Sequence, residues 1–184
     1  MPLLRSAVVM AATVPLFAGA LSPVAMTAVD AFPACPMTVP NGYTPRGEPP
    51  SRSRHGNSAL WTLLWPGGTV VFAPGGSGFV LPDGSLSMKW PWTRGVRGTL
   101  TIRGKRLDAP APPLRARIPE GYGDIGFQST ALIFPTPGCW EVTGQVNGKS
   151  LTFVTLVVKI GKGPGAGAFS NAPVCCATGY ASGN

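Results

Sequence analysis

Glycine and proline recur between short apolar runs along most of this 184-residue chain. It contains 25 Gly and 21 Pro, about a quarter of all residues, and both residue types destabilise the interior of a helix. Beyond the N-terminal apolar segment, no stretch keeps the i, i+3, i+4, i+7 apolar spacing of an amphipathic helix. The chain is therefore expected to form many short strands joined by tight turns.

The runs between these turns have the pattern of half-buried strands. Apolar and polar residues alternate in "LSMKWPW", "LTIR" and "LRARI", so one side of each strand is apolar. Asn147-Gly148, which favours a type I′ hairpin turn, separates the last two runs. We predict an all-β, antiparallel sandwich of seven or eight strands over residues 59–161. Residues 162–184, rich in small residues, are predicted to form a disordered tail.

The N-terminus has the pattern of an export signal. A short positive segment, Met1 to Arg5, precedes the apolar run "SAVVMAATVPLFAGA". We predict a signal peptide over residues 1–31, with cleavage after residue 20 or after residue 31. The protein is then secreted or associated with the cell envelope, and only an uncleaved leader would hold it in a membrane. Residues 32–58 are predicted to be an extended or loop lead-in.

Export places the four cysteines in an oxidising compartment, where cysteines pair. Cys139 opens a predicted core strand, directly before Trp140, and Cys35 is the only other cysteine near the domain. We predict a disulfide between Cys35 and Cys139. Four cysteines allow three connectivities, and the pairing of the adjacent Cys175 and Cys176 in the tail stays open.

The segment "PGCWEVTGQVNGKSLTFVTLVV" resembles the last two strands of bacterial immunoglobulin-like sandwiches. The run from "HGNSALWTLLWPGG" through "FPTPGCWEVTG" is also similar to small exported bacterial proteins of unassigned function. The resemblance covers roughly residues 35–160 and implies an immunoglobulin-like architecture, but no particular chemistry. Because Trp140 directly follows Cys139, the disulfide pattern of antibody domains does not transfer.

Residues suited to catalysis or metal binding are few. The chain has one histidine, and no favourable spacing joins Ser58, His55 and Asp83 into a catalytic triad. An alternative function is copper binding, with His55 as the weak candidate, although such sites usually need more imidazole or methionine ligands. A further alternative is a carbohydrate-active hydrolase using Glu120 and Asp124. We expect no cofactor and no enzymatic activity.

Binding features are richer, because the formal charge is +8 and basic residues gather between Arg94 and Arg117. If Trp90 and Trp92 were exposed, they would form a platform for sugar rings, although their alternation with Lys89 favours the core. The ligand-binding candidates are Trp90, Trp92, Arg94, Arg97, Arg103, Arg115 and Arg117. We expect a monomeric, non-catalytic module that binds an acidic cell-wall polymer or another anionic surface. Nucleic acid is not an expected partner.

Overall fold

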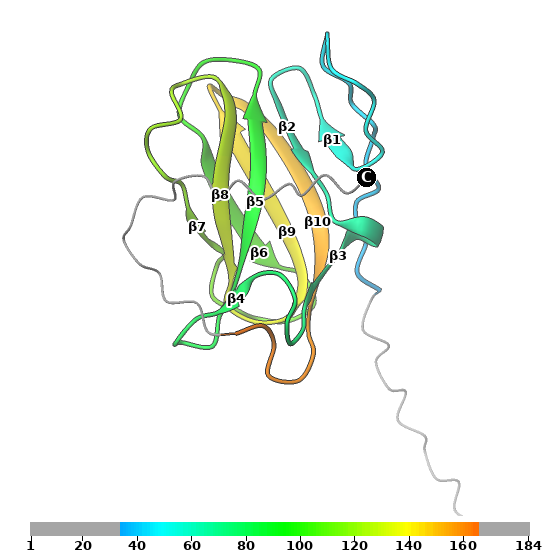
Figure 1. Ribbon diagram of the computed structural model, residues 1–184, viewed down its shortest axis with the longest axis vertical. Coiled ribbons are helices and arrows are strands. Elements are labelled where there is room, and N and C mark those ends of the chain that lie inside the picture. The colour runs from blue at the N-terminus through cyan, green and yellow to red at the C-terminus, as the bar shows by residue number, and fades with distance from the viewer. Residues whose placement is uncertain (1–33, 166–184) are drawn as a thin grey trace, which may run out of the picture. The chain divides into compact units, whose positions relative to one another are not determined.

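The structure of the protein is a computed structural model that describes residues 34–165. This part of the chain contains ten strands and no α-helix (Figure 1). The larger sheet contains β1 (Arg54–Gly56), β2 (Leu60–Leu63), β5 (Leu86–Arg94), β8 (Gly126–Phe134) and β7 (Arg115–Arg117) in that order, with β4 (Phe79–Val80) also paired to β5. The smaller sheet contains β3 (Thr69–Phe72), β10 (Lys149–Lys159), β9 (Gly138–Val146) and β6 (Thr101–Arg106) in that order. We call them sheet A and sheet B.

The all-β prediction is confirmed, and the predicted hairpin turn is present at Asn147-Gly148, where both residues have positive φ and β9 pairs with β10. One pairing differs from the purely antiparallel expectation, because β3 runs parallel to β10. The cause lies in the 3-10 turn Pro66–Gly68, which contains two glycines of positive φ. This turn follows β2 of sheet A and leads directly into β3 at the edge of sheet B.

Aromatic side chains join the two sheets face to face. The ring of Trp90 in sheet A stacks on Phe153 in sheet B, with centroids 5.1 Å apart. Gly144 in β9 leaves room for the neighbouring indole, since a Cβ there would lie 2.6 Å from the ring of Trp92. The largest fully buried side chains are Trp90, Trp92, Trp140, Phe72, Phe134 and Phe153. Trp140 lies in β9, which was predicted to be a core strand, and its full burial agrees with that prediction.

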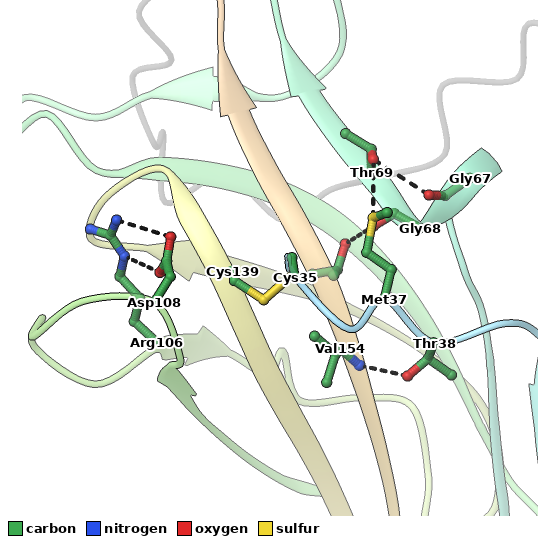
Figure 2. The surroundings of a disulfide bond; sticks show 11 residues. Cys35, Met37, Thr38, Gly67, Gly68, Thr69, Arg106, Asp108, Cys139 and Val154 are labelled. Carbon is green, nitrogen blue, oxygen red and sulfur yellow. Dashed lines mark hydrogen bonds and ion pairs between the residues drawn. A yellow bond between two sulfur atoms is a disulfide. The ribbon is translucent and has the colours of Figure 1, made fainter. Parts of the chain in front are cut away.

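The predicted Cys35–Cys139 disulfide is present and joins the lead-in segment to β9 (Figure 2). The backbone N–H of Thr38 donates to the carbonyl of Val154 at 3.0 Å, and the N–H of Val154 donates to the Thr38 hydroxyl at 2.8 Å. Further along, the amide of Asn41 donates to the Gly56 carbonyl and accepts from the Gly56 N–H. The lead-in is therefore held along the edge of β10.

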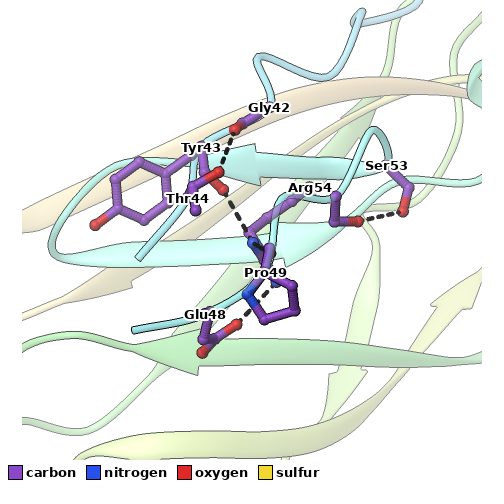
Figure 3. Close-up of polar contacts among 8 residues, drawn as sticks. Gly42, Tyr43, Thr44, Glu48, Pro49, Ser53 and Arg54 are labelled. Atoms are coloured by element: carbon purple, nitrogen blue, oxygen red, sulfur yellow. Dashed lines mark hydrogen bonds and ion pairs between the residues drawn. The ribbon is translucent and has the colours of Figure 1, made fainter. Parts of the chain in front are cut away.

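A buried arginine folds the next part of the lead-in onto the domain (Figure 3). Arg54 Nη2 lies 2.8 Å from a carboxylate oxygen of Glu48, and its Nη1 donates to the carbonyls of Pro49 and Tyr43. Arg54 also begins β1, which pairs with β2. The lead-in was predicted to reach residue 58, but the strand pairing starts at Arg54.

The predicted signal segment 1–31, Cys175, Cys176 and most of the predicted tail lie outside the described residues. At the C-terminal boundary, Gly163 and Pro164 are buried, and Gly163 lies against Val80. Packing therefore continues past residue 161, where the domain was expected to end. Among residues 34–165, no helix has the length and apolarity needed to cross a membrane.

Candidate functional site

A pocket of about 860 Å³ lies at the end of the sandwich where β5 ends and β8 begins. Three connections that are distant in sequence line it: the β5–β6 loop, the β7–β8 loop and the β9–β10 turn. Its lining residues include Arg94, Arg97, Thr99, Glu120, Tyr122, Asp124, Gln128 and Asn147. The pocket thus gathers two of the predicted binding arginines and both carboxylates of the hydrolase alternative.

Two buried polar side chains at the end of the core hold the loops of this pocket. Arg94 is only 3% exposed, and its guanidinium donates to the carbonyls of Gly98, Tyr122 and Gly123 at 2.8–3.3 Å. Gln128 is 6% exposed, and its Nε2 donates to the carbonyl of Pro119 at 3.1 Å. Arg94 was predicted to contact a ligand, but its Nη groups instead fasten the β5–β6 and β7–β8 loops to β5.

An ion pair lies at the exposed side of the pocket. Arg97 Nη1 donates to both carboxylate oxygens of Asp124, at 3.0 and 2.9 Å. The hydrogen bond from Arg97 holds the pKa of Asp124 below its ordinary value. Asp124 therefore stays ionised and is unsuited to act as a general acid, so in the hydrolase alternative the acid role would fall to Glu120.

Aromatic and aliphatic side chains border the same loops. Tyr122 lines the pocket, and its ring contacts Phe127 edge to face, with centroids 6.0 Å apart. Phe127 is 54% exposed and Ile125 is 45% exposed. Tyr122 is therefore the aromatic residue of the lining, and its ring connects the pocket loop to the exposed Phe127 of β8.

The tryptophans predicted as a sugar platform lie elsewhere. Trp90 and Trp92 are both fully buried between the sheets, and Trp90 Nε1 donates to the Thr62 hydroxyl at 2.9 Å. The cause is the alternation of β5, which points both indoles to the same side as Leu86 and Met88 in the core. They are corrected from ligand-binding candidates to core residues.

The remaining predicted arginines do not lie on one surface. Ile102 in β6 packs against the core, so its neighbour Arg103 points outward from sheet B. Ala116 in β7 also packs against the core, so Arg115 and Arg117 point outward from sheet A. Arg103 donates to Gln145 at 2.9 Å and is separated from the other two by the thickness of the sandwich.

The outer face of sheet A nevertheless brings three basic residues together. Lys89 in β5 and Arg117 in β7 are both paired with Ala131 of β8, so they lie in one row across the sheet. Two strand spacings place their backbones about 10 Å apart. Arg115 lies two residues from Arg117 along β7 and is exposed. We call Lys89, Arg115 and Arg117 the basic strip.

A carboxylate at the end of the basic strip has an unusual pKa. Asp83 accepts hydrogen bonds from the hydroxyl and backbone N–H of Ser85 and from Arg115. These bonds, that from the Ser85 hydroxyl first, lower the pKa of Asp83 from 3.8 to about 2.

We therefore expect the Asp83 carboxyl to titrate near pH 2 in a carbon-detected NMR titration of the purified protein. Because the folded pKa is depressed, its stabilising contribution is present above pH 3.8 and is lost as the pH falls toward 2. Ser85→Ala should return the midpoint toward 3.8, and Arg115→Gln should move it less. A wild-type midpoint near 3.8 would contradict this assignment.

The other catalytic and metal candidates are not assembled into a site. His55 shares a row with Thr62 and Trp92, whereas Asp83 precedes the opposite end of β5. Six residues of strand separate these positions, which is about 20 Å, so no triad forms with Ser58. In the described residues no group of three or more His, Cys, Asp or Glu side chains is placed to hold a metal ion.

Gln128 is a buried pocket residue that the sequence analysis did not single out. It occupies an inward position in β8, where Leu132 and Phe134 face the core. The sequence did contain a signal for it, because Gln128 stands at an even spacing from Leu132 and Phe134 and therefore on the same, apolar side of the strand. In comparisons with known proteins, no family model, curated protein or solved structure matches this chain.

Proposed function

We propose that this chain is an exported, non-catalytic binding module of the cell envelope or extracellular space, and that the basic strip binds an acidic polymer. The observation that carries the proposal is the row formed by Lys89, Ala131 and Arg117, with Arg115 beside it. The small side chain of Ala131 lies between the two cations in this row. The Cys35–Cys139 disulfide supports the export part of this proposal, because disulfides persist in oxidising compartments outside the cytoplasm.

The strand order supports an immunoglobulin-like architecture for this module. The order β2-β5-β8-β7 corresponds to strands A-B-E-D of that fold, and β10-β9-β6 corresponds to G-F-C. The chain also crosses between the sheets at the same points as in that fold, because β5 of sheet A leads to β6 of sheet B and β8 of sheet A leads to β9 of sheet B. In immunoglobulin variable domains, loops at one end of such a scaffold bind the ligand, while the scaffold stays rigid.

The ion pair within the strip is compatible with polymer binding. Arg115 and Asp83 approach to 2.6 Å, but both side chains are 53% exposed. Exposed ion pairs contribute about 0–1 kcal/mol, so an anionic group of a polymer can replace Asp83 at little cost. Removing this competing carboxylate with Asp83→Asn should therefore strengthen polymer binding.

The test compares two charge-matched variants on a heparin column, with heparin as a sulfated polysaccharide probe. Replacing Lys89, Arg115 and Arg117 by Gln should abolish retention or lower the salt concentration needed for elution several-fold. The reason is that these three cations make the contacts with heparin that salt weakens by screening. Replacing Arg103, Lys105 and Lys149 by Gln removes the same charge from sheet B and the hairpin, and should change elution little. Equal losses for the two variants, or retention of wild type that is indifferent to salt, would refute the proposal.

A further inference from the structure

Two aromatic side chains lie in one row across the outer face of sheet A, at the end where β5 finishes. Thr93 of β5 is paired with Trp61 of β2 on one side and with Phe127 of β8 on the other. In each strand the residue that follows is buried, so these three side chains point outward. Two strand spacings place the backbones of Trp61 and Phe127 about 10 Å apart.

Two further rings extend this row at its ends. Tyr43 of the lead-in contacts Trp61, with ring centroids 5.6 Å apart, and Tyr122 contacts Phe127 at 6.0 Å. Phe127 is 54% exposed, and the other three residues are partly exposed. We call Tyr43, Trp61, Phe127 and Tyr122 the aromatic row. It presents aromatic surface to the solvent.

The lead-in side of the aromatic row is held in place by polar contacts and close packing. The buried Arg54 donates from Nη1 to the carbonyl of Tyr43 at 3.4 Å (Figure 3), and the Tyr43 N–H donates to the side chain of Asn41. The indole of Trp61 reaches Gly95, where an added Cβ would lie 2.9 Å from the ring. These rings are therefore positioned before any ligand binds, which lowers the ordering cost of binding.

The aromatic row and the basic strip lie on the same face of the molecule. Phe127 and Ala131 are four residues apart in β8, about 13 Å along the strand, and both point outward with Ser129 between them. Ala131 is paired with Lys89 on one side and with Arg117 on the other. A polymer lying along β8 would therefore meet a ring first and cations next. A single sugar unit is shorter than this distance, so one ligand reaches both only as an oligomer.

The charge and the rings of this face together define a ligand class. The six strands of sheet A contain no Asp or Glu, and the basic strip attracts anionic groups. A linear polyphosphate supplies anionic groups but has no ring to pack on an aromatic side chain. An acidic polysaccharide supplies both, because its sugar rings have apolar C–H faces that pack on aromatic surface.

We propose that the polymer bound by the basic strip is an acidic polysaccharide, with sugar rings packed on the aromatic row. Its carboxylate or sulfate groups pair with Lys89, Arg115 and Arg117, and its chain runs along β8. This inference rests on the proposed function, because it names the class of polymer that the basic strip binds.

The test is an NMR titration of the purified full chain with a heparin octasaccharide, a heparin disaccharide and a linear polyphosphate. The octasaccharide should shift the resonances of the basic strip together with the Trp61 indole N–H and the Phe127 ring. It should also give nuclear Overhauser contacts between sugar C–H protons and these two rings. Polyphosphate should shift the basic strip alone. The disaccharide should bind more weakly than the octasaccharide, because it is too short to reach both groups.

Variants separate the two groups of contacts. The double change Trp61→Ala and Phe127→Ala should weaken octasaccharide binding about tenfold and leave polyphosphate binding unchanged. Phe127→Ala alone, at a half-exposed position, should show a smaller loss of the same kind and stays informative if the double variant does not fold. Leu107→Ala is the control, since Leu107 is 39% exposed and follows β6 of sheet B. It should change neither affinity.

Three outcomes would overturn the inference. They are octasaccharide binding that the aromatic variants leave unchanged, an equal loss of polyphosphate binding in these variants, and dimerisation of the wild type that Phe127→Ala abolishes. The last, seen by sedimentation, would assign the aromatic row to self-association.

The variant with Gln at Lys89, Arg115 and Arg117 distinguishes this inference from the proposed function. If it binds the octasaccharide and polyphosphate as tightly as wild type, the proposed function fails and the inference fails with it. If it loses both ligands while the aromatic variants keep both, the basic strip stands as the polymer site and only the polysaccharide assignment is rejected.

Discussion

Replacing Trp90 by alanine is expected to lower the free energy of unfolding by about 3–5 kcal/mol, the range for large aromatic residues in cores. Trp90 is fully buried and stacks on Phe153 of the opposite sheet, so its loss opens a cavity between the two layers. It also leaves the Thr62 hydroxyl without the donor that now lies 2.9 Å away. Equilibrium denaturation in urea measures the loss.

Trp61→Ala serves as the comparison for this substitution. Trp61 lies in β2, is only partly buried, and contacts Tyr43 on the outside of sheet A. Its removal should cost clearly less than the removal of Trp90. A loss of unfolding free energy under about 1 kcal/mol for Trp90→Ala, or one no larger than that for Trp61→Ala, would contradict the packing of the two sheets against each other through Trp90.

Removing the disulfide with the double change Cys35→Ala and Cys139→Ala is expected to lower stability by about 2–5 kcal/mol. The bond closes a long loop, since its cysteines are 104 positions apart in sequence, and such a crosslink strongly restricts the unfolded chain. Thermal unfolding with and without a reducing agent measures the effect. Reduction should lower the melting temperature of wild type and leave the variant unchanged.

Hydrogen exchange separates this global effect from release of the lead-in. The Val154 amide donates to the Thr38 hydroxyl, which belongs to the segment that Cys35 anchors. Its exchange should accelerate more in the variant than that of Val142, which lies in the centre of sheet B. Equal stability of the variant and wild type would show that the disulfide does not hold the lead-in in place.

The fold was predictable where the period-two pattern was clear. Leu100 and Leu114 are buried, as the alternation in "LTIR" and "LRARI" predicted, and Asn147-Gly148 forms the expected turn. The parallel pairing of β3 was not predictable, since its edge position depends on the path set by the 3-10 turn at Pro66–Gly68. The three-residue β1 is too short to carry a periodic signal.

The candidate site was less predictable than the fold. Gly98, Glu120 and Asn147 come from three separate connections, and only the sheet topology brings them to one pocket. Arg94 looked like an exposed cation by residue type, yet it follows Trp90 and Trp92 at two-residue spacing and shares their inward face. Strand phase was therefore a better guide to its role than its charge.

The most direct test of the proposed binding function is chemical-shift mapping with a short heparin oligosaccharide on the isotope-labelled protein. The account predicts saturable, salt-sensitive shifts centred on Lys89, Arg115 and Arg117, with smaller changes at Ala131 between them. Shifts centred on Arg103 of sheet B, or the absence of any shift at low salt, would contradict it.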